Sequence, residues 1–266
     1  MDFRQIRLFC FDMDGTIYLD RTPIPGAIEL LNLLQERSIP FIYLTNNSSK
    51  SVKDYMKKLQ EIGFPATEEN FYTSGQAAGV YLTAHFPGVP CYVMGTDSLK
   101  SELKTYGVDV REEVSPEIGV FLAGYDTQLT YQKLTDACEL LRRDVPFLAT
   151  NPDWVCPMGK DEYLPDCGLM CQMLEVSTGK KPKFIGKPEP DMILQLLERF
   201  GVEKDACCMV GDRMYTDIAS GLNAGVKTVC VLSGEVTKEE VLAAERQPDL
   251  LLDSVKDIYL ALTDKQ

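Results

Sequence analysis

Short apolar runs alternate with helical patterns at the start of the chain. Residues 6–11, Ile-Arg-Leu-Phe-Cys-Phe, form an apolar run that stops abruptly at Asp-Met-Asp-Gly-Thr. A parallel strand that is buried on both faces has this continuous apolar pattern and delivers polar residues to its carboxyl edge. Apolar residues then recur at helical spacing from Pro25 to Arg37, and a second strand is predicted over Phe41–Leu44. The order strand, helix, strand predicts a parallel sheet.

The same alternation of strands and helices returns at the end of the chain. We assign this last part to the same domain as the first segment. Strands are predicted over 207–210, 227–232 and 250–252, with a helix near 217–224. Polar residues again follow directly after an apolar strand at Gly211-Asp212. Open α/β sheets bind their ligands at the carboxyl ends of the strands, so this edge is the expected place for a site.

The middle of the chain carries an α/β pattern of its own. Strands are predicted over 91–94, 119–123 and 146–149, and helices over 98–106, 131–142 and 167–177. We therefore predict an α/β fold with two domains. A Rossmann-like, parallel-sheet core domain is formed by residues 1–77 and 183–266, and a second α/β domain is inserted at 78–182.

Amino-acid composition indicates which class of protein this is. With 266 residues, 45% hydrophobic and 25% charged, the chain is typical of a folded globular protein. No stretch reaches the roughly 18 to 20 apolar residues of a membrane-spanning helix, and the first residues lack the pattern of a secretory signal. We expect a cytoplasmic protein without a membrane partner. The nine cysteines contain no CxxC pattern and are expected to be reduced thiols.

Charge and the scarcity of histidine exclude several functions. The net charge of −13 disfavours nucleic acid as a partner, because binding there requires clustered Lys and Arg. His85 is the single histidine and lies near an expected helix end, where we interpret it as structural or exposed. Phosphohistidine, Ser/His/Asp and His-rich two-metal mechanisms are therefore disfavoured.

Two aspartates follow the first strand. Asp12 and Asp14 would point the same way if the strand stayed regular, which would bring two carboxylates close enough to repel each other. A hard divalent cation such as Mg²⁺ would neutralise them, with water and a substrate phosphate completing its shell. The alternative is a simple turn, because Asp-Gly is common turn chemistry.

Three further motifs lie at other predicted strand ends. Thr45, Asn46 and Asn47 offer a hydroxyl, amides and backbone N–H groups to phosphate oxygens. Lys187, in Gly-Lys-Pro-Glu-Pro, offers a cation to a phosphoryl group and to the acidic residues. The last motif, Gly-Asp-Arg-Met-Tyr-Thr-Asp, adds two aspartates at 212 and 217. Each motif alone is more typical of a turn or a helix cap than of a ligand site.

Taken in order, the four motifs resemble those of the phosphatases of the haloacid dehalogenase superfamily. The resemblance covers the whole chain. It implies Asp12 as nucleophile, Asp14 as general acid and base, and Thr45 and Lys187 as phosphate ligands. It further implies that Mg²⁺ is held by Asp12, the Asp14 backbone carbonyl and Asp212, with Asp217 as a supporting carboxylate.

The implied reaction is consistent with these residue types. Asp12 attacks phosphorus and forms an aspartyl phosphate, while protonated Asp14 gives its proton to the leaving alkoxide. Asp14 then activates the water that releases phosphate. The metal ion and Lys187 balance the charge that develops on the phosphoryl oxygens.

Motif spacing places the inserted domain. Asp12 and Thr45 are 33 positions apart, which leaves room for a small flap and one helix, whereas Thr45 and Lys187 are 142 apart. An insertion in this second interval, with Ala-Gly-Tyr-Asp at 123–126 and Ala-Thr-Asn-Pro-Asp at 149–153, resembles the NagD-like and para-nitrophenyl phosphatase subfamily with its C2-type cap. The resemblance implies a small phosphate ester as substrate, such as a sugar phosphate or a nucleotide, and a monomer or homodimer.

The cap residues expected to face the substrate are Asp126, Asp153 and Trp154. The loop from Asp153 to Gly168 would face the leaving group. Members of the family often have Pro-Gly-x-Gly before the last cap helix, where this chain has Pro-Asp-Cys-Gly at 165–168. The aspartate at 166 makes a transfer of substrate identity from relatives unsafe.

Four alternatives stay open at the level of sequence. One is a non-enzymatic scaffold, although every acidic position that the mechanism needs is present. Cys207 and Arg213 have the Cys-x5-Arg spacing of cysteine-dependent phosphatases, but the intervening residues are strand-like and Asp212 would repel phosphate. A phospho-accepting receiver module also uses clustered aspartates, Thr and Lys, although in a different order and with about half this length. A phosphotransferase or mutase on the same scaffold would return the phosphate to a sugar.

Overall fold

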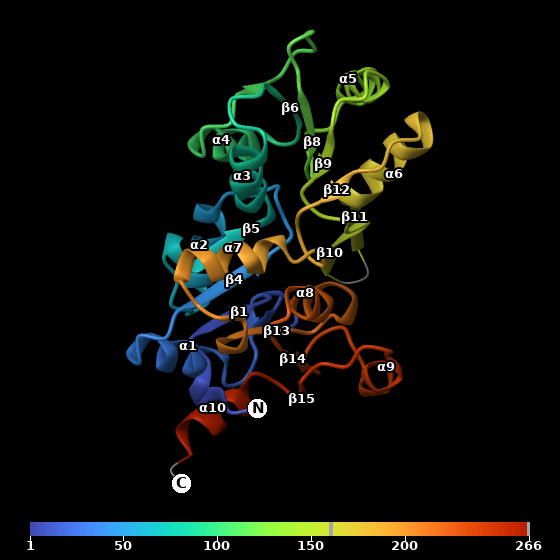
Figure 1. Cartoon of the computed structure of the whole chain (residues 1–266). Helices are drawn as coiled ribbons and strands as arrows, with labels where there is room; N and C mark the ends of the chain where they lie inside the picture. Colours follow the sequence, from blue (N-terminus) through green and yellow to red (C-terminus); the bar gives the residue numbers. More distant parts are fainter. Residues whose placement is uncertain (160–161, 265–266) are drawn as a thin grey trace. The chain divides into compact units, whose positions relative to one another are not determined.

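The computed structural model describes residues 1–159 and 162–264 (Figure 1). The chain forms two compact units. The first unit contains Met1–Thr45, Val52–Tyr72 and Lys187–Gln266, and the second contains Asn46–Ser51 and Thr73–Gly186. The unit boundaries lie a few residues outside the 78–182 insertion proposed from sequence, and the short segment after Thr45 belongs with the second unit.

A six-stranded sheet forms the centre of the first unit. Its strands lie in the order β15-β14-β13-β1-β4-β5. Their bounds are Leu250–Leu252 (β15), Lys227–Val231 (β14), Cys207–Gly211 (β13), Leu8–Phe11 (β1), Phe41–Thr45 (β4) and Phe71–Thr73 (β5). Strand β1 pairs in parallel with both β13 and β4, as the alternating pattern predicted. The register places Phe9 between Cys208 and Phe41.

Helices and short elements connect these strands. The α-helices of the first unit are α1 (Ala27–Glu36), α2 (Val52–Glu61), α7 (Asp191–Phe200), α8 (Ala219–Ala224), α9 (Lys238–Ala243) and α10 (Lys256–Thr263). Short helical turns are η1 (Phe3–Gln5), η2 (Glu68–Asn70), η3 (Lys204–Ala206) and the π-helical η4 (Met214–Ile218). A small hairpin of β2 (Tyr18–Leu19) and β3 (Thr22–Pro23) is the flap that fits between the first two motifs.

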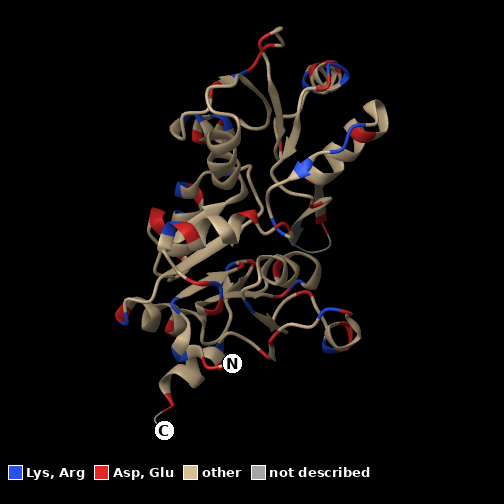
Figure 2. Ribbon diagram, in the orientation of Figure 1, with Lys and Arg blue, Asp and Glu red and all other residues tan. Residues whose placement is uncertain are grey.

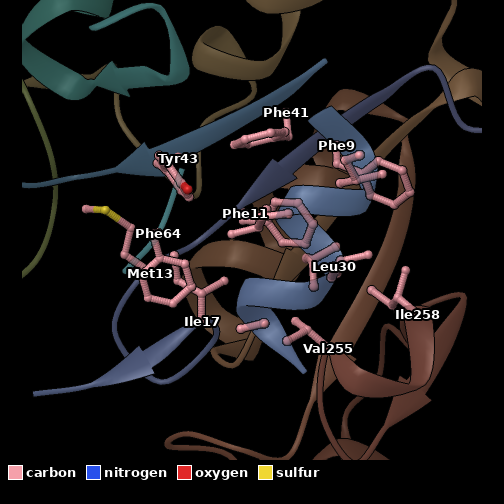
Figure 3. Close-up of a cluster of buried hydrophobic side chains, with 14 of the residues drawn as sticks. Phe9, Phe11, Met13, Ile17, Leu30, Phe41, Tyr43, Phe64, Val255 and Ile258 are labelled. Atoms are coloured by element: carbon pink, nitrogen blue, oxygen red, sulfur yellow. The ribbon is translucent and has the colours of Figure 1, made fainter. Parts of the chain in front are cut away.

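Aromatic side chains dominate the core of the first unit. Figure 3 shows Phe9 and Phe11 of β1 beside Leu30 of α1, with Phe41 of β4 nearby. The rings of Phe9 and Phe11 are stacked with centroids 5.7 Å apart. Replacing one such buried phenylalanine by alanine typically costs about 3–5 kcal/mol, so this core holds β1 firmly in the middle of the sheet.

The second unit is built around a parallel sheet of its own, in the order β12-β9-β8-β6-β7. The strands are β12 (Lys183–Phe184), β9 (Phe147–Ala149), β8 (Val120–Ala123), β6 (Cys91–Met94) and β7 (Val110–Arg111). The helices are α3 (Ser74–His85), α4 (Asp97–Thr105), α5 (Tyr131–Arg142) and α6 (Cys167–Thr178). A separate antiparallel hairpin consists of β10 (Val155–Gly159) and β11 (Glu162–Pro165). Residues 160–161, which belong to the loop predicted to face the leaving group, lie outside the described residues.

Polar residues at strand and helix ends fix the second unit. Thr96 and Thr130 cap α4 and α5 by accepting backbone N–H bonds, which satisfies donors that a helix start leaves without an intrahelical partner. Inside the sheet, the ring of Phe121 lies 5.1 Å from that of Phe147. The second unit thus has its own core and its own caps.

Acidic and basic residues are interspersed along helices of both units, for example along α5 and α9 (Figure 2). All nine cysteines are free thiols. Among the residues that the structure describes, no helix is long and apolar enough to span a bilayer.

Candidate active site

Asp12 follows the central strand of the first unit. Its backbone N–H donates to the Val210 carbonyl at 2.9 Å, so the sheet ladder continues one residue past β1 and fixes the start of the motif. Its side chain is 16% exposed, and Oδ1 accepts a 2.6 Å hydrogen bond from the Lys187 ammonium. One carboxylate oxygen of Asp12 is therefore fixed by a cation in a largely buried position.

Lys187 links three segments of the first unit. Its Nζ donates to Asp12 Oδ1, to Asp217 Oδ1 at 2.7 Å and to the Leu44 carbonyl at 3.2 Å. Burial alone would lower the pKa of this lysine, but Asp12 and then Asp217 raise it above its ordinary value. Lys187 therefore stays charged between two strand ends.

Asp217 lies on the π-helical turn that follows β13. Its Oδ2 accepts from the Arg213 backbone N–H at 3.1 Å, while Oδ1 accepts from Lys187. A Cβ at Gly211 would lie 2.2 Å from Asp217 Cβ, so only glycine allows the turn to fold back so closely. Single π-turns are frequent at functional sites, and this one brings a buried carboxylate back over the strand end. The predicted helix therefore begins differently, with η4 preceding α8.

Asp212 is fixed from both sides. Thr16 Oγ1 donates to Oδ1 at 3.1 Å, and the Glu235 backbone N–H donates to Oδ2 at 2.8 Å. Gly15 has a φ of +87°, and a Cβ there would lie 2.4 Å from Asp212 Oδ2. The first and last motifs are thus packed directly against each other.

Three carboxylates gather in this place. Ligand oxygens of Asp12, Asp212 and Asp217 all lie within 4.8 Å of one another. Burial, followed by the Asp217 carboxylate, raises the pKa of Asp12 well above its ordinary value and that of Asp212 to about 6. One lysine does not balance three carboxylates, and the surplus of two negative charges in an all-oxygen environment fits a divalent cation such as Mg²⁺.

Asp14 differs from its predicted position. The strand ends at Phe11, so the alternation of a regular strand does not carry on to residue 14. The Asp14 side chain is 63% exposed and accepts a 3.1 Å hydrogen bond from the Tyr18 hydroxyl, while Lys58 Nζ lies 3.9 Å away. The expected strong repulsion between Asp12 and Asp14 is thus not seen, because the carboxylates that press on Asp12 are Asp217 and Asp212.

The second motif is divided between the two units. Thr45 is buried at the end of β4, one residue after the carbonyl that Lys187 contacts. Asn46 Nδ2 instead donates to Asp153 Oδ2 at 2.8 Å. Asn47 Oδ1 accepts from the backbone N–H and the hydroxyl of Ser49, at 2.9 and 2.7 Å. Both asparagine side chains thus take part in the second unit's own hydrogen bonds, and their role toward phosphate stays a prediction.

The residues predicted to face the substrate have different environments. Asp126 is buried, accepts from the Gln128 backbone N–H at 2.9 Å and pairs with Lys133 at 2.7 Å. This closed arrangement braces the turn after β8 and offers no exposed oxygen. Trp154 is 63% exposed, and Asp153 is partly buried. Asp153 and Trp154 therefore remain the candidates for substrate contact.

Sequence reasoning missed several supporting residues. Thr16 binds Asp212, and Tyr18 and Lys58 hold Asp14, with the Lys58 ammonium 4.2 Å from the centroid of the Tyr18 ring. Arg213 forms an ion pair with Glu235 at 2.8 Å. The position of Thr16 and Tyr18 just past the first motif could have identified them as site residues. Nothing in the sequence pattern of α2 distinguishes Lys58 from the other residues of that helix.

Comparison with known proteins agrees with this geometry. The family model described as haloacid dehalogenase-like hydrolase matches residues 9–109, and a second model, HAD-hydrolase-like, matches 184–258. An acid sugar phosphatase of Staphylococcus aureus is 34% identical over 261 residues, which cover 98% of this chain and 98% of the relative.

Solved structures match this chain over nearly its whole length. The 4-nitrophenylphosphatase of Thermotoga maritima has a TM-score of 0.91 and 38% identity, covering 97% of this chain and 98% of its own. NagD of Escherichia coli K-12 has a TM-score of 0.88 and 28% identity, covering 95% and 98%. The glycerol phosphate phosphatase of Mycobacterium tuberculosis, solved in complex with magnesium, has a TM-score of 0.90 and 28% identity, covering 97% and 78%. Motifs, fold and relatives agree, and the chain belongs to the haloacid dehalogenase-like hydrolases, among the NagD-like phosphatases.

Proposed function

We propose that this protein is a magnesium-dependent phosphatase that hydrolyses small phosphate monoesters through an aspartyl-phosphate intermediate. The observation that carries this proposal is the position of Asp12. One of its oxygens binds Lys187, and the carboxylate lies in a cluster with Asp212 and Asp217 that has two surplus negative charges. Such a cluster places a nucleophile and a cation site within a few ångströms of each other.

Each site residue of the first unit has a role in this proposal. Asp12 attacks phosphorus, and Lys187 with Thr45 holds the phosphoryl oxygens. Asp217 keeps Lys187 in place, since Asp217 Oδ1 accepts its second side-chain bond. Mg²⁺ would be held by Asp12, Asp212 and the Asp14 carbonyl, where it would supply positive charge to the phosphoryl group.

Asp14 handles the protons. As an acid it gives a proton to the leaving oxygen, and as a carboxylate it takes a proton from the water that attacks the phosphorylated Asp12. Its exposed side chain accepts a hydrogen bond from the Tyr18 hydroxyl and lies 3.9 Å from the Lys58 ammonium. The hydroxyl of Tyr18 remains protonated, because burial and then Asp14 raise its pKa above the ordinary value.

Relatives support the substrate class. The Staphylococcus aureus relative is an acid sugar phosphatase and the Mycobacterium tuberculosis structure is a glycerol phosphate phosphatase. We propose sugar phosphates and similar small monoesters, with Asp153 and Trp154 of the second unit contacting the leaving group. The aspartate at 166 argues against transferring one particular ester from a relative.

A phosphate-release screen tests the proposal. The purified protein is stripped with a chelator and offered sugar phosphates, nucleoside monophosphates, phosphoglycolate, pyridoxal phosphate and 4-nitrophenyl phosphate, with and without Mg²⁺. We expect inorganic phosphate to be released only after Mg²⁺ is restored. Isomerised sugar phosphate without phosphate release would indicate a mutase, and a stable phosphoprotein without turnover of any ester would indicate a receiver module.

A further inference from the structure

The β10–β11 hairpin of the second unit leaves and rejoins the chain at one point. The Asp166 N–H donates to the Trp154 carbonyl at 2.9 Å, and the Gly168 N–H donates to the Asp153 carbonyl at 2.8 Å. A Cβ at Gly168 would lie 2.0 Å from the Pro152 carbonyl oxygen, so the backbones are in direct contact. We call this point, residues 151–154 with 166–168, the hairpin base.

A chain of side-chain hydrogen bonds crosses the hairpin base. Asn151 Nδ2 donates to Asp153 Oδ2 at 2.9 Å and to Asp166 Oδ1 at 3.0 Å. Asn46 donates to the same Asp153 oxygen at 2.8 Å, and Thr150 Oγ1 donates to Asn151 Oδ1 at 2.8 Å. Because both carboxylates need donors, the orientation of the Asn151 amide is determined. One amide therefore connects two carboxylates that would otherwise repel each other.

Asp166 is the buried end of this chain. Its side chain caps α6, since Oδ1 also accepts the Cys167 N–H at 2.5 Å, and the residue is 4% exposed. The start of a helix favours a negative charge. Burial nevertheless raises the pKa of Asp166 to about 6, against the bonds from Asn151 and Cys167, and Asp153 adds to the rise.

Among the described residues, Asp166 interacts with an aspartate, a tyrosine and a cysteine. Asp153 is the carboxylate that acts on Asp166. Burial raises the pKa of Tyr125, which follows β8, above its ordinary value, and the charge of Asp166 adds to the rise. The hydrogen bond with Cys167 and then burial raise the pKa of the Cys171 thiol on α6, and the charge of Asp166 adds to this rise as well. Both therefore stay neutral near pH 6, and Asp166 is the group of the hairpin base expected to change charge there.

We propose that Asp166 is a positioning residue for substrate binding, whose carboxylate holds Asp153 and the start of the hairpin in one arrangement through Asn151. Uptake of a proton by Asp166 loosens that arrangement, because hydrogen bonds to a charged acceptor are about twice as strong as those to a neutral one. The proposal rests on the proposed function, in which Asp153 and Trp154 contact the ester. Asp166 itself is buried and acts through its neighbours.

Trp154 provides a readout that needs no catalysis. It is the chain's single tryptophan, and its carbonyl accepts the bond from the Asp166 N–H. We expect the tryptophan fluorescence of the native protein to titrate with a midpoint near pH 6. In Asp166→Asn, which retains an acceptor oxygen for α6, this transition should be absent while circular dichroism shows an intact fold. The same titration in Asp166→Asn would overturn the proposal.

Kinetics provide the second readout. The ratio of KM for Asp166→Asn to KM for the native enzyme, taken at each pH, cancels the ionisation of the substrate phosphate. It should be close to one below about pH 5 and rise about fivefold above about pH 7, with kcat unchanged. Thr130→Ala, which removes the cap of α5 in the same unit, is the control and should give a ratio independent of pH.

The two readouts separate this inference from the proposed function. If the protein hydrolyses no ester, the proposed function fails, and the fluorescence titration still decides whether Asp166 controls the hairpin base. If esters are hydrolysed and the KM ratio for Asp166→Asn does not change with pH, the positioning role is wrong and the phosphatase assignment stands.

Discussion

Each unit of the protein contains a cluster of buried acidic groups, and the two clusters are held together differently. In the first unit the ammonium of Lys187 lies between Asp12 and Asp217, with Asp212 close by. In the second unit an uncharged amide, that of Asn151, lies between two aspartates. An ammonium reduces the charge of a cluster, whereas an amide only supplies donors and leaves the charge unchanged.

This difference separates a cation site from a structural brace. The first cluster remains two charges short of neutrality: its aspartates follow β1 and β13 of one sheet, and Lys187 lies in the segment before α7. The second has a carboxylate with an elevated pKa whose donors are a side-chain amide and a helix N-terminus. Three carboxylates lie close together in the first cluster, whereas in the second a neutral amide separates two carboxylates, one of which, Asp153, is proposed to contact the ester.

The nucleophile gives the strongest test of this contrast. Asp12→Asn removes the attacking carboxylate and retains its shape, so turnover should fall by about 10⁴-fold or more. Phosphate release on a sugar phosphate and on 4-nitrophenyl phosphate is the measurement. The buried Cys207, part of the rival Cys-x5-Arg spacing, provides the control, since Cys207→Ser should turn over normally. A reversal of these two results would assign catalysis to the cysteine.

Lys187→Met tests the charge balance of the first cluster. We expect kcat to fall about 10²–10³-fold, because a fixed positive charge at the phosphoryl group is lost. The free energy of unfolding should fall by about 3–5 kcal/mol, because two carboxylates are left in a buried site without their cation.

The double variant separates these two effects. Adding Asp217→Asn to Lys187→Met removes one of the stranded charges, so part of the lost stability should return while kcat stays low. Denaturant titrations of the single and double variants measure the first quantity and phosphate release the second. Equal stability of the two variants would show that the lysine does not act by balancing charge.

Asp14 should show an effect that depends on the leaving group. In Asp14→Asn, kcat/KM for an alkyl phosphate should fall about 10²-fold, because the alkoxide needs a proton as it departs. Nitrophenolate departs without one, so 4-nitrophenyl phosphate should show a rapid burst followed by slow hydrolysis of the phosphorylated Asp12. Tyr18→Phe, which retains the ring under Lys58, should change both substrates little. Equal losses for the two esters would argue against Asp14 as the acid.

The sequence could predict those parts of the fold and site that follow from the strands. The apolar runs placed β1, β4 and β13, and the residues after them gave Asp12 and Asp212, which the structure brings together. Spacing also gave the small flap after the first motif. These features depend on local pattern and on one topological rule, that parallel strands end at a common edge.

The remaining features of the site depend on side-chain contacts, which a local sequence pattern does not predict. The orientation of Asp14 is decided by Tyr18 and by Lys58 from another helix, and Asp126 is enclosed by Lys133. The regular alternation assumed for residues 12–14 failed because the strand had already ended at Phe11. Asp166 was recognised only as a departure from a family pattern, since its bond to Asn151 spans 15 positions.

The smallest expected effect is a dependence of stability on pH, and it separates the two clusters. The pKa of Asp166 is raised from 3.8 to about 6 on folding, so the folded protein binds more protons than the unfolded chain between these values. Stability should therefore fall as pH rises from about 4 to about 7, by on the order of 1–3 kcal/mol from this group, and Asp166→Asn should lack that part.

Asp212, whose pKa is also raised to about 6, should contribute in the same direction in the protein without metal. A cation favours the ionised form of a ligand carboxylate, so Mg²⁺ should remove the contribution of the first cluster and leave that of Asp166. Denaturant titrations across pH, with and without Mg²⁺, for native protein and Asp166→Asn, measure both parts. If Mg²⁺ removed the whole slope in the native protein, the brace in the second unit would not be titrating, and the contrast between the two clusters would be lost.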